Sequence, residues 1–212
     1  MQTVEAHERG LRKSSQLSGF QVDKAIPPLD VIRALNDAKI SFVLVGAYGL
    51  AGWRKEPRAT EDVDVVVAAK QVKKAVKVLC NAFPELEPVD LPVIVRLRQR
   101  GTENVAIDVM KPVQQPYREV FKHTHSVQMG KQKFRVPSLE MAVLMKYSAM
   151  TSLNRAEEDI HQDAHDFILI VKNNRELDKE KLAELGTLLY ADGGKDALEL
   201  VSKALAGEKL NL

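Results

Sequence analysis

The sequence predicts an α/β domain, built on a mixed sheet with flanking helices, followed by an all-helical domain. Up to about residue 137, short runs of valine, leucine and isoleucine alternate with segments whose apolar residues recur every three or four positions. These two spacings are typical of buried strands and amphipathic helices. After residue 137 only the helical spacing continues. We therefore expect an N-terminal arm over residues 1–25, an α/β domain over 26–136 and a helical domain over 137–212.

Apolar spacing, glycines and prolines predict the elements of the α/β domain in order. The polar arm is helical or frayed, and Pro28 suits the first turn of the helix that follows it. Pro84, Pro88 and Pro92 mark a loop. The expected elements are helix 28–38, strand 40–45, helix 47–53, strand 62–67, helix 70–83, a hairpin of strands 93–98 and 105–109, helix 114–122, and a hairpin over 126–136.

Ser138 is a favourable N-cap and opens the helical domain, with Glu140 in the first turn of its first helix. Apolar spacing predicts helices near 138–153, 156–173, 178–190 and 194–206.

Two acidic residues interrupt the second predicted strand. Residues two apart in a strand point to the same face, so Asp62 and Asp64 lie together while Val63 and Val65 point into a core. Aspartate is disfavoured in strands, and two adjacent carboxylates repel each other. A sheet edge facing water is one explanation of the pair. A bridging divalent cation, Mg²⁺ or Mn²⁺, is the explanation that we favour, because these ions prefer oxygen ligands.

A third carboxylate, Asp108, lies in the middle of the apolar strand 105–109. Two-metal phosphoryl-transfer sites use acidic ligands of this kind. The order is therefore a glycine corner at Gly46, the Asp62 and Asp64 pair, and a later single aspartate on another strand.

These residues resemble the nucleotidyltransferase superfamily, which has the fold of DNA polymerase β, and within it the AbiEii-like or MNT-like bacterial group. That group has Gly-Gly-x-Ala, then Arg-x-Thr, then Asp-Ile-Asp. The corresponding runs here are Gly46-Ala47-Tyr48, Arg58-Ala59-Thr60 and Asp62-Val63-Asp64. The resemblance covers residues 40–110 and, more loosely, the helical part to about 172. Ala47 departs from the pattern, since it replaces the second glycine or serine of the corner.

The resemblance implies a Mg²⁺-dependent enzyme that moves a nucleoside monophosphate from an NTP, such as ATP, to an acceptor hydroxyl and releases pyrophosphate. Asp62 and Asp64 would hold the metal that carries the triphosphate. Asp108 would complete a second metal site and act as general base. The active site is expected in a cleft between the two domains.

Five further residues are predicted to bind the nucleotide. Gly46 and Ala47 begin a short helix whose free N–H groups suit phosphate, although an ordinary strand-to-helix turn is the alternative. Arg58 and Thr60 would steady the active-site loop or reach phosphate, unless they belong to a plain surface loop. Lys146, in an apolar stretch of helix, would touch the triphosphate or else extend its amine from the helix edge into solvent.

Other charged residues have two interpretations. The row Arg96, Arg98 and Arg100 is either a solvated face or a contact for a polyanionic acceptor such as RNA. Asp163 and Asp166 lie three apart on one helix face, and we interpret them as salt-bridge anchors of the helical domain rather than as catalytic groups.

The bulk composition limits the partners. The net charge of +2 neither indicates nor excludes nucleic-acid binding. No apolar run approaches the about 18 residues of a membrane span, and residues 1–20 lack a secretory h-region, so we expect a cytoplasmic protein with no membrane contact. The expected partners are an NTP donor, an acceptor that is a small molecule, a protein or RNA, and a cognate toxin or antitoxin protein. The alternative is a catalytically degenerate nucleotide- or partner-binding module, which Ala47 favours.

Overall fold

The computed structural model describes residues 2–21 and 25–210, which form two compact units. The first unit comprises Met1–Gly52 and Glu56–Pro137, and the second comprises Trp53–Lys55 and Ser138–Leu212. The chain therefore enters the second unit briefly at Trp53, returns to the first, and enters the second again at Ser138. Within the described residues, no helix combines the length and hydropathy that a membrane span requires.

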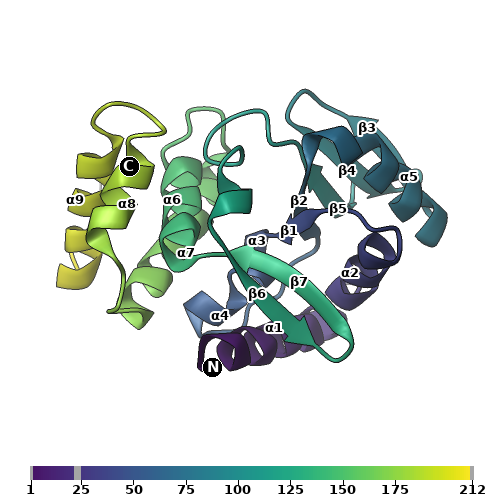
Figure 1. Ribbon diagram of the computed structural model, residues 1–212, viewed down its shortest axis with the longest axis horizontal. Coiled ribbons are helices and arrows are strands. Elements are labelled where there is room, and N and C mark those ends of the chain that lie inside the picture. The colour runs from purple at the N-terminus through teal and green to yellow at the C-terminus, as the bar shows by residue number, and fades with distance from the viewer. Residues whose placement is uncertain (1, 22–24, 211–212) are drawn as a thin grey trace. The chain divides into compact units, whose positions relative to one another are not determined.

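The first unit contains both sheets of the described chain (Figure 1). Its elements are α1 (Gln2–Gln21), α2 (Pro28–Asp37), β1 (Phe42–Leu44), α3 (Gly46–Gly49), the start of α4 (Ala51–Arg54), β2 (Val63–Val67), η1 (Ala69–Gln71), α5 (Val72–Ala82), β3 (Leu86–Asp90), β4 (Ile94–Gln99), β5 (Val105–Met110), η2 (Val120–Lys122), β6 (Thr124–Met129) and β7 (Gln132–Pro137).

The main sheet is mixed, with strand order β1-β2-β5-β4-β3. Strands β2 and β5 are parallel, and the other neighbouring pairs are antiparallel. The register sets Asp64 beside Asp108 and Asp108 beside Arg96, so the three side chains form one row across β2, β5 and β4. Val65 and Val109, at the next register position, are buried in the core.

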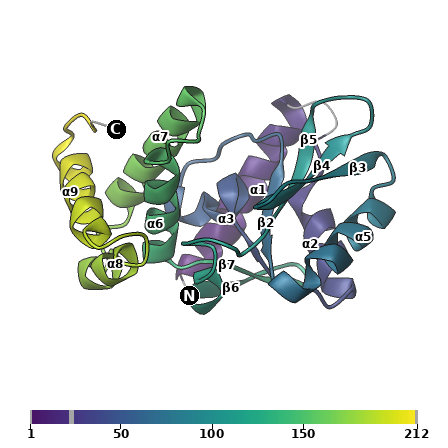
Figure 2. The same ribbon diagram turned by 90° about the horizontal axis from the view of Figure 1, so that it is seen from above.

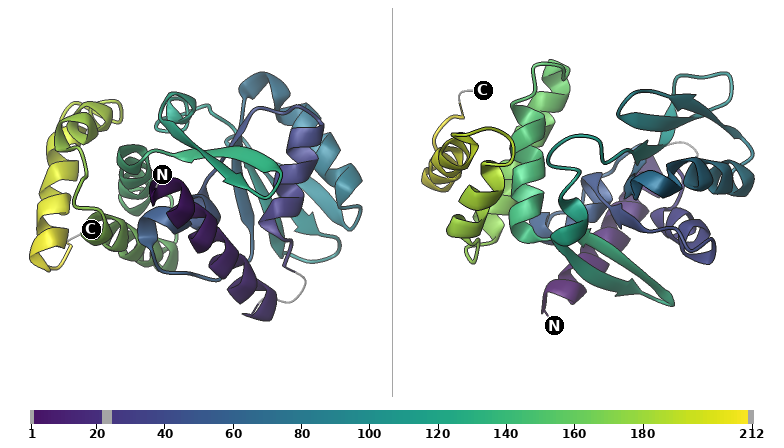
Figure 3. Two further views of the ribbon diagram at one scale, coloured as in Figure 1. Left: turned by 60° about the horizontal axis from the view of Figure 1, so that its bottom comes forward. Right: turned by 45° about the horizontal axis from the view of Figure 1, so that its top comes forward.

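Helices α2 and α5 pack against each other beside the main sheet (Figure 2). The buried residues of α5 are Val72, Ala75 and Leu79, which lie on one helical face. The hairpin β6–β7 is a separate two-stranded sheet; β6 contacts α1, and β7 contacts β1 and α2 (Figure 3). Helix α1 also contacts α3, so the predicted arm is an ordered helix within the first unit.

Three sequence-based expectations differ from the structure. The segment with Pro84, Pro88 and Pro92 was expected to be a loop, but it contains strand β3. This strand lies at the edge of the sheet, where a proline that has no N–H can be accommodated, so Pro88 does not prevent strand pairing. The segment 114–122 has only the 3₁₀ turn Val120–Lys122, since Pro116 disfavours a helix at its start. The helix expected over 47–53 is two short helices, α3 and α4, in a stretch where glycines weaken helical propensity.

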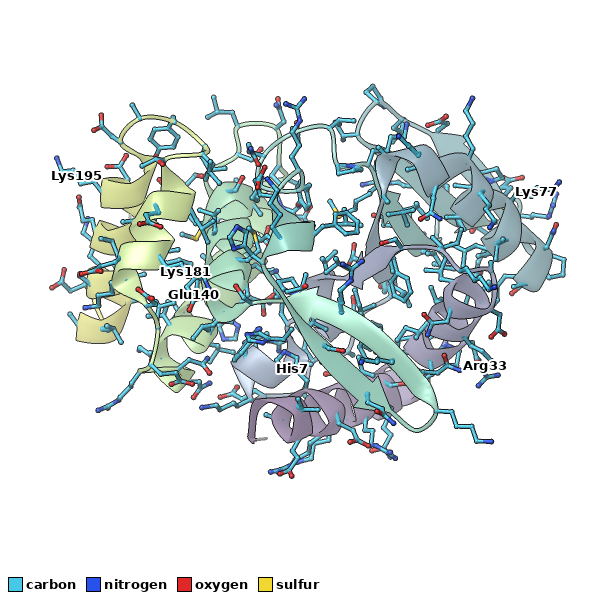
Figure 4. The ribbon with its side chains drawn as sticks, viewed as in Figure 1. His7, Arg33, Lys77, Glu140, Lys181 and Lys195 are labelled. Carbon is cyan, nitrogen blue, oxygen red and sulfur yellow. The ribbon has the colours of Figure 1, made fainter. Side chains whose placement is uncertain are left out.

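The second unit is helical. Its elements are residues 53 and 54 of α4, then α6 (Leu139–Met150), α7 (Glu157–Asn173), α8 (Lys179–Gly186) and α9 (Gly193–Ala206). Helix α6 is buried along most of its length, including its charged residues Glu140 and Lys146, and is packed by α7 and α8. The Ser138 side chain caps it by accepting from the Met141 N–H, as predicted. Lys181 of α8 reaches Glu140 of α6 at 3.0 Å (Figure 4).

The segment Trp53–Lys55 is held by the end of α7. The side-chain amide of Asn174 donates to the Trp53 carbonyl at 2.7 Å, and that of Asn173 donates to the Arg54 carbonyl at 2.6 Å. The Arg54 side chain is buried and lies 3.0 Å from Asp166. Side chains and backbone therefore both fix this segment within the second unit.

Candidate active site

The three aspartates that the sequence predicts as metal ligands come together in the first unit. Asp64 and Asp108 are register partners on the parallel strands β2 and β5, and Asp62 comes directly before β2. One carboxylate oxygen from each residue lies within 4.8 Å of the other two. Asp62 and Asp64 are partly exposed, whereas Asp108 is buried. The cluster therefore has a solvent-accessible side and a buried base.

Asp108 has an environment that is unfavourable for its charged form. Its Oδ1 atom is buried and accepts no hydrogen bond from any residue that the structure describes. The nearest recorded cation is Arg96, whose Nε lies 3.7 Å from that oxygen. Burial, and then the charge of Asp62, raise the pKa of Asp108 to about 6, although Arg96 and Arg98 act in the opposite direction. An additional cation at this cluster would stabilise the charged form.

Gly46 lies directly against the Asp64 carboxylate. Its φ of +58° is in the left-handed region, and a β-carbon at this position would lie 1.8 Å from Asp64 Oδ2. The Val45 N–H also donates to the Asp64 carbonyl at 3.0 Å. The glycine corner therefore leaves space for a carboxylate of the acidic cluster, which is a role that the phosphate-cradle prediction did not include.

Asp62 is oriented by the loop that precedes it. Thr60 Oγ1 donates to Asp62 Oδ1 at 2.9 Å. The N–H groups of Arg58 and Thr60 donate to the side-chain hydroxyls of Ser14 and Ser18 on α1, at 3.1 and 3.0 Å. Sequence reasoning did not assign a function to these two serines. Their spacing of four residues along a helix was the only available signal, and it does not identify their partners.

The donor set fits a divalent cation of the Mg²⁺ class. Three carboxylates supply hard oxygen ligands, and one of them has a buried oxygen without a hydrogen bond from the described residues. Such a cluster is electrostatically unfavourable on its own, and a bound cation compensates it.

The predicted nucleotide ligands Ala47 and Lys146 do not belong to this cluster of carboxylates. The Ala47 side chain is buried, so any contact with phosphate would use its backbone N–H. Lys146 belongs to the second unit, where its ammonium lies 2.7 Å from both Asp163 and Asp166. Arg155 also pairs with Asp163. Asp163 and Asp166 thus form the buried salt bridges that we expected of them.

Replacing Lys146 with methionine is expected to lower the unfolding free energy by about 3 kcal/mol. The change leaves two buried carboxylates without their shared cation, and breaking a buried ion pair from one side costs about 3 to 5 kcal/mol. Chemical denaturation of the full chain measures the effect. Lys172→Met, at an exposed position of α7, is the matched control and should change stability by less than about 1 kcal/mol. Equal stability of the two variants would contradict the prediction.

Comparison with solved structures places the fold among the nucleotidyltransferases. The crystal structure of an antigenic nucleotidyltransferase-like protein from Paracoccidioides brasiliensis aligns with a TM-score of 0.53 and 20% identity, over 93% of this chain and 94% of that chain. The solution structure of the antibiotic-resistance factor ANT(2'')-Ia aligns with a TM-score of 0.51 and 11% identity, over 84% of this chain and 92% of that chain. At these identities the likeness is one of fold.

The sequence itself identifies the family. Residues 30–211 match the family model described as nucleotidyl transferase AbiEii toxin, type IV TA system. The chain belongs to this AbiEii family and is a transferase of the nucleotidyltransferase class. A search of curated proteins finds no significant match.

Proposed function

We propose that the protein transfers a nucleoside monophosphate from an NTP to an acceptor hydroxyl, releases pyrophosphate, and depends on Mg²⁺ or Mn²⁺. The single observation that carries this proposal is the convergence of Asp62, Asp64 and Asp108 within 4.8 Å. Membership of the AbiEii family supports the reaction class. The buried Oδ1 of Asp108, which accepts no hydrogen bond from the described part of the chain, supports the need for a cation.

Each aspartate has a proposed role in this reaction. Asp62 and Asp64 would hold the cation that binds the triphosphate, and Asp108 would complete the site on the acceptor side. A bound divalent cation supplies charge neutralisation and a fixed orientation for the phosphates. The acceptor oxygen forms a bond to the α-phosphorus, the bond from that phosphorus to the pyrophosphate oxygen breaks, and Asp108 receives the hydroxyl proton.

The remaining predicted ligands act around this centre. The backbone N–H groups of Gly46 and Ala47 would meet phosphate oxygens, as proposed for the glycine corner. Thr60 would position Asp62, and Arg58 would hold the same loop or reach phosphate. For Lys146 to touch the triphosphate, its ammonium would have to leave the two aspartates that it binds.

The family description also suggests the biological setting. We propose that the chain is the enzymatic toxin of a type IV toxin–antitoxin pair, with a cognate antitoxin protein as its partner. The acceptor would be a small molecule, a protein or an RNA. Of the three arginines in the predicted row, Arg96 and Arg98 lie on β4; Arg98 pairs with Glu103, and Arg96, beside Asp108, favours a polyanionic acceptor among these three.

A thermal-melt screen tests the donor site. ATP, GTP, CTP and UTP are added with and without Mg²⁺ to the native chain, to Asp64→Asn and to the exposed control Asp37→Asn. A ligand at a hundredfold its dissociation constant adds about 2.7 kcal/mol, which corresponds to about 5 to 10 °C for a chain of this size. We expect a Mg²⁺-dependent rise with at least one NTP in the native chain and in the control, and no rise in Asp64→Asn.

The opposite result identifies the alternative function. No shift with any of the four nucleotides, or an equal shift in Asp64→Asn, would contradict the donor site. That outcome would favour the degenerate binding module, whose partner would then be sought by co-purification.

A further inference from the structure

We infer that helix α1 is a positioning element of the active site, in which Ser14 and Ser18 hold the loop that carries Asp62. The inference rests on the proposed function, because it concerns the metal-ligand geometry. Helix α1 ends at Gln21, whereas the segment that matches the family begins at residue 30. The family match therefore does not account for this helix.

Two hydrogen bonds connect α1 to the loop. Ser14 and Ser18 lie one helical turn apart on the same face of α1, and both side chains are buried, at 0% and 1% exposure. Ser14 Oγ accepts from the Arg58 N–H and Ser18 Oγ accepts from the Thr60 N–H. The Ser18 hydroxyl donates in turn to the Ser14 carbonyl at 3.0 Å, which fixes its orientation.

The connection continues to the metal ligands through one more bond. The backbone N–H of Thr60 donates to Ser18 Oγ, and the Thr60 side-chain hydroxyl donates to Asp62 Oδ1. A displacement of Thr60 would therefore move the hydroxyl that orients Asp62, without removing any atom of the carboxylate cluster itself.

A second set of contacts makes α1 a fixed support rather than a loose arm. A β-carbon at Gly10 would lie 2.5 Å from the Ala51 carbonyl oxygen, so α1 lies in direct backbone contact with the start of α4. His7 of α1 fills the space above Gly52, where a β-carbon would lie 2.4 Å from its ring (Figure 4). Helix α1 thus contacts both the segment after the glycine corner and the loop before β2.

Mn²⁺ binding and catalysis test the inference in four variants of the full chain. The single variant Ser18→Ala removes one accepting hydroxyl, and the double variant with both Ser14→Ala and Ser18→Ala removes both. Ser18→Thr keeps a hydroxyl. Ser15→Ala, at a partly exposed position of the same helix, is the matched control. Electron paramagnetic resonance measures the Mn²⁺ dissociation constant, well below the melting temperature of each variant. Circular dichroism checks that each remains folded, and kcat and KM are measured where a donor has been identified.

We expect the loss of positioning to appear in metal affinity. Groups that orient metal ligands typically change affinity or activity by 10- to 100-fold when removed, so Ser18→Ala should weaken Mn²⁺ binding by about tenfold and the double variant by more. Ser18→Thr should remain within about threefold of the native chain, and Ser15→Ala should match it. The effect on turnover should fall on kcat more than on KM.

The outcomes separate this inference from the proposed function. A lower melting temperature with unchanged Mn²⁺ affinity and kcat would show that the serines only stabilise the fold, and would overturn the inference. Native chain that binds no Mn²⁺, or binds it equally well in Asp64→Asn, would instead overturn the metal site on which the proposed function rests.

Discussion

Gly46→Ala is expected to abolish nucleotidyl transfer while leaving the protein folded. The added β-carbon would occupy a point 1.8 Å from Asp64 Oδ2, so the carboxylate must move by more than 1 Å. A displacement of about 1 Å in a reacting group costs about 100-fold in rate, and here it affects a proposed metal ligand directly. We expect at least that loss of kcat, together with loss of high-affinity Mn²⁺ binding by electron paramagnetic resonance.

Gly130→Ala separates the clash from backbone strain. Gly130, in the turn between β6 and β7, has a φ of +60°, close to the +58° of Gly46, but a β-carbon there meets no heavy atom within 4 Å. Both substitutions impose left-handed strain of about 1 to 2 kcal/mol, so both should lower the melting temperature, and the clash should lower it further in Gly46→Ala. Only Gly46→Ala should lose activity and metal binding. Native activity in Gly46→Ala would show that Asp64 is not needed at its observed position.

Asp108→Asn is expected to make the metal-free protein more stable and inactive. The pKa of Asp108 is raised from 3.8 to about 6, chiefly by burial, so ionised Asp108 destabilises the folded state. The difference corresponds to about 3 kcal/mol of unfolding free energy at pH 8. Removing the charge should therefore raise the melting temperature in EDTA by about 5 to 10 °C. The same change removes the proposed general base and a metal ligand.

The stability difference between Asp108→Asn and the native chain is expected to decrease as the pH falls. From about pH 7 upward the Asp108 carboxyl is ionised in both folded and unfolded states, so its unfavourable contribution to the unfolding free energy is complete. As the pH falls from about 6 to about 4 the folded state takes up a proton first, and that contribution disappears. The stability advantage of Asp108→Asn should thus be constant above about pH 7 and shrink as the pH falls through 6 to about 4.

Two controls accompany this measurement. Asp90→Asn, at an exposed strand position paired with Lys111, should change the melting temperature little at any pH. Addition of Mg²⁺ at pH 8 should stabilise the native chain more than Asp108→Asn, which lacks one of the three proposed ligands. A lower melting temperature of Asp108→Asn in EDTA at pH 8 would show that the carboxylate is stabilised in the fold, contrary to the prediction.

The sequence predicted the centre of the fold and the members of the acidic cluster. Alternation predicts a shared face for Asp62 and Asp64, and the need for a third carboxylate together with the family resemblance adds Asp108 to them. The parallel pairing of β2 and β5 then brings Asp64 beside Asp108. Local pattern was sufficient here because strand periodicity is a short-range property.

The features that sequence missed depend on contacts between distant segments. Pro88 argues against a strand unless β3 is known to be at the edge of the sheet, which is a property of the whole topology. Ser14 and Ser18 act through loop N–H groups more than 40 positions away. The two carboxylates around Lys146 come from another helix, so its sequence neighbours give no sign of them.

Because Trp53–Lys55 belong to the second unit, residues 138–212 alone do not contain all of that unit. A gene segment encoding residues 138–212 alone would omit Arg54 and thereby deprive the buried Asp166 of one of its two recorded cationic partners. It would also leave Asn174 without the Trp53 carbonyl that it binds. Recombination at the junction of residues 137 and 138 therefore does not transfer a complete helical unit. The two halves of the protein are expected to diversify together, by point substitution and loop change, rather than by exchange of whole domains.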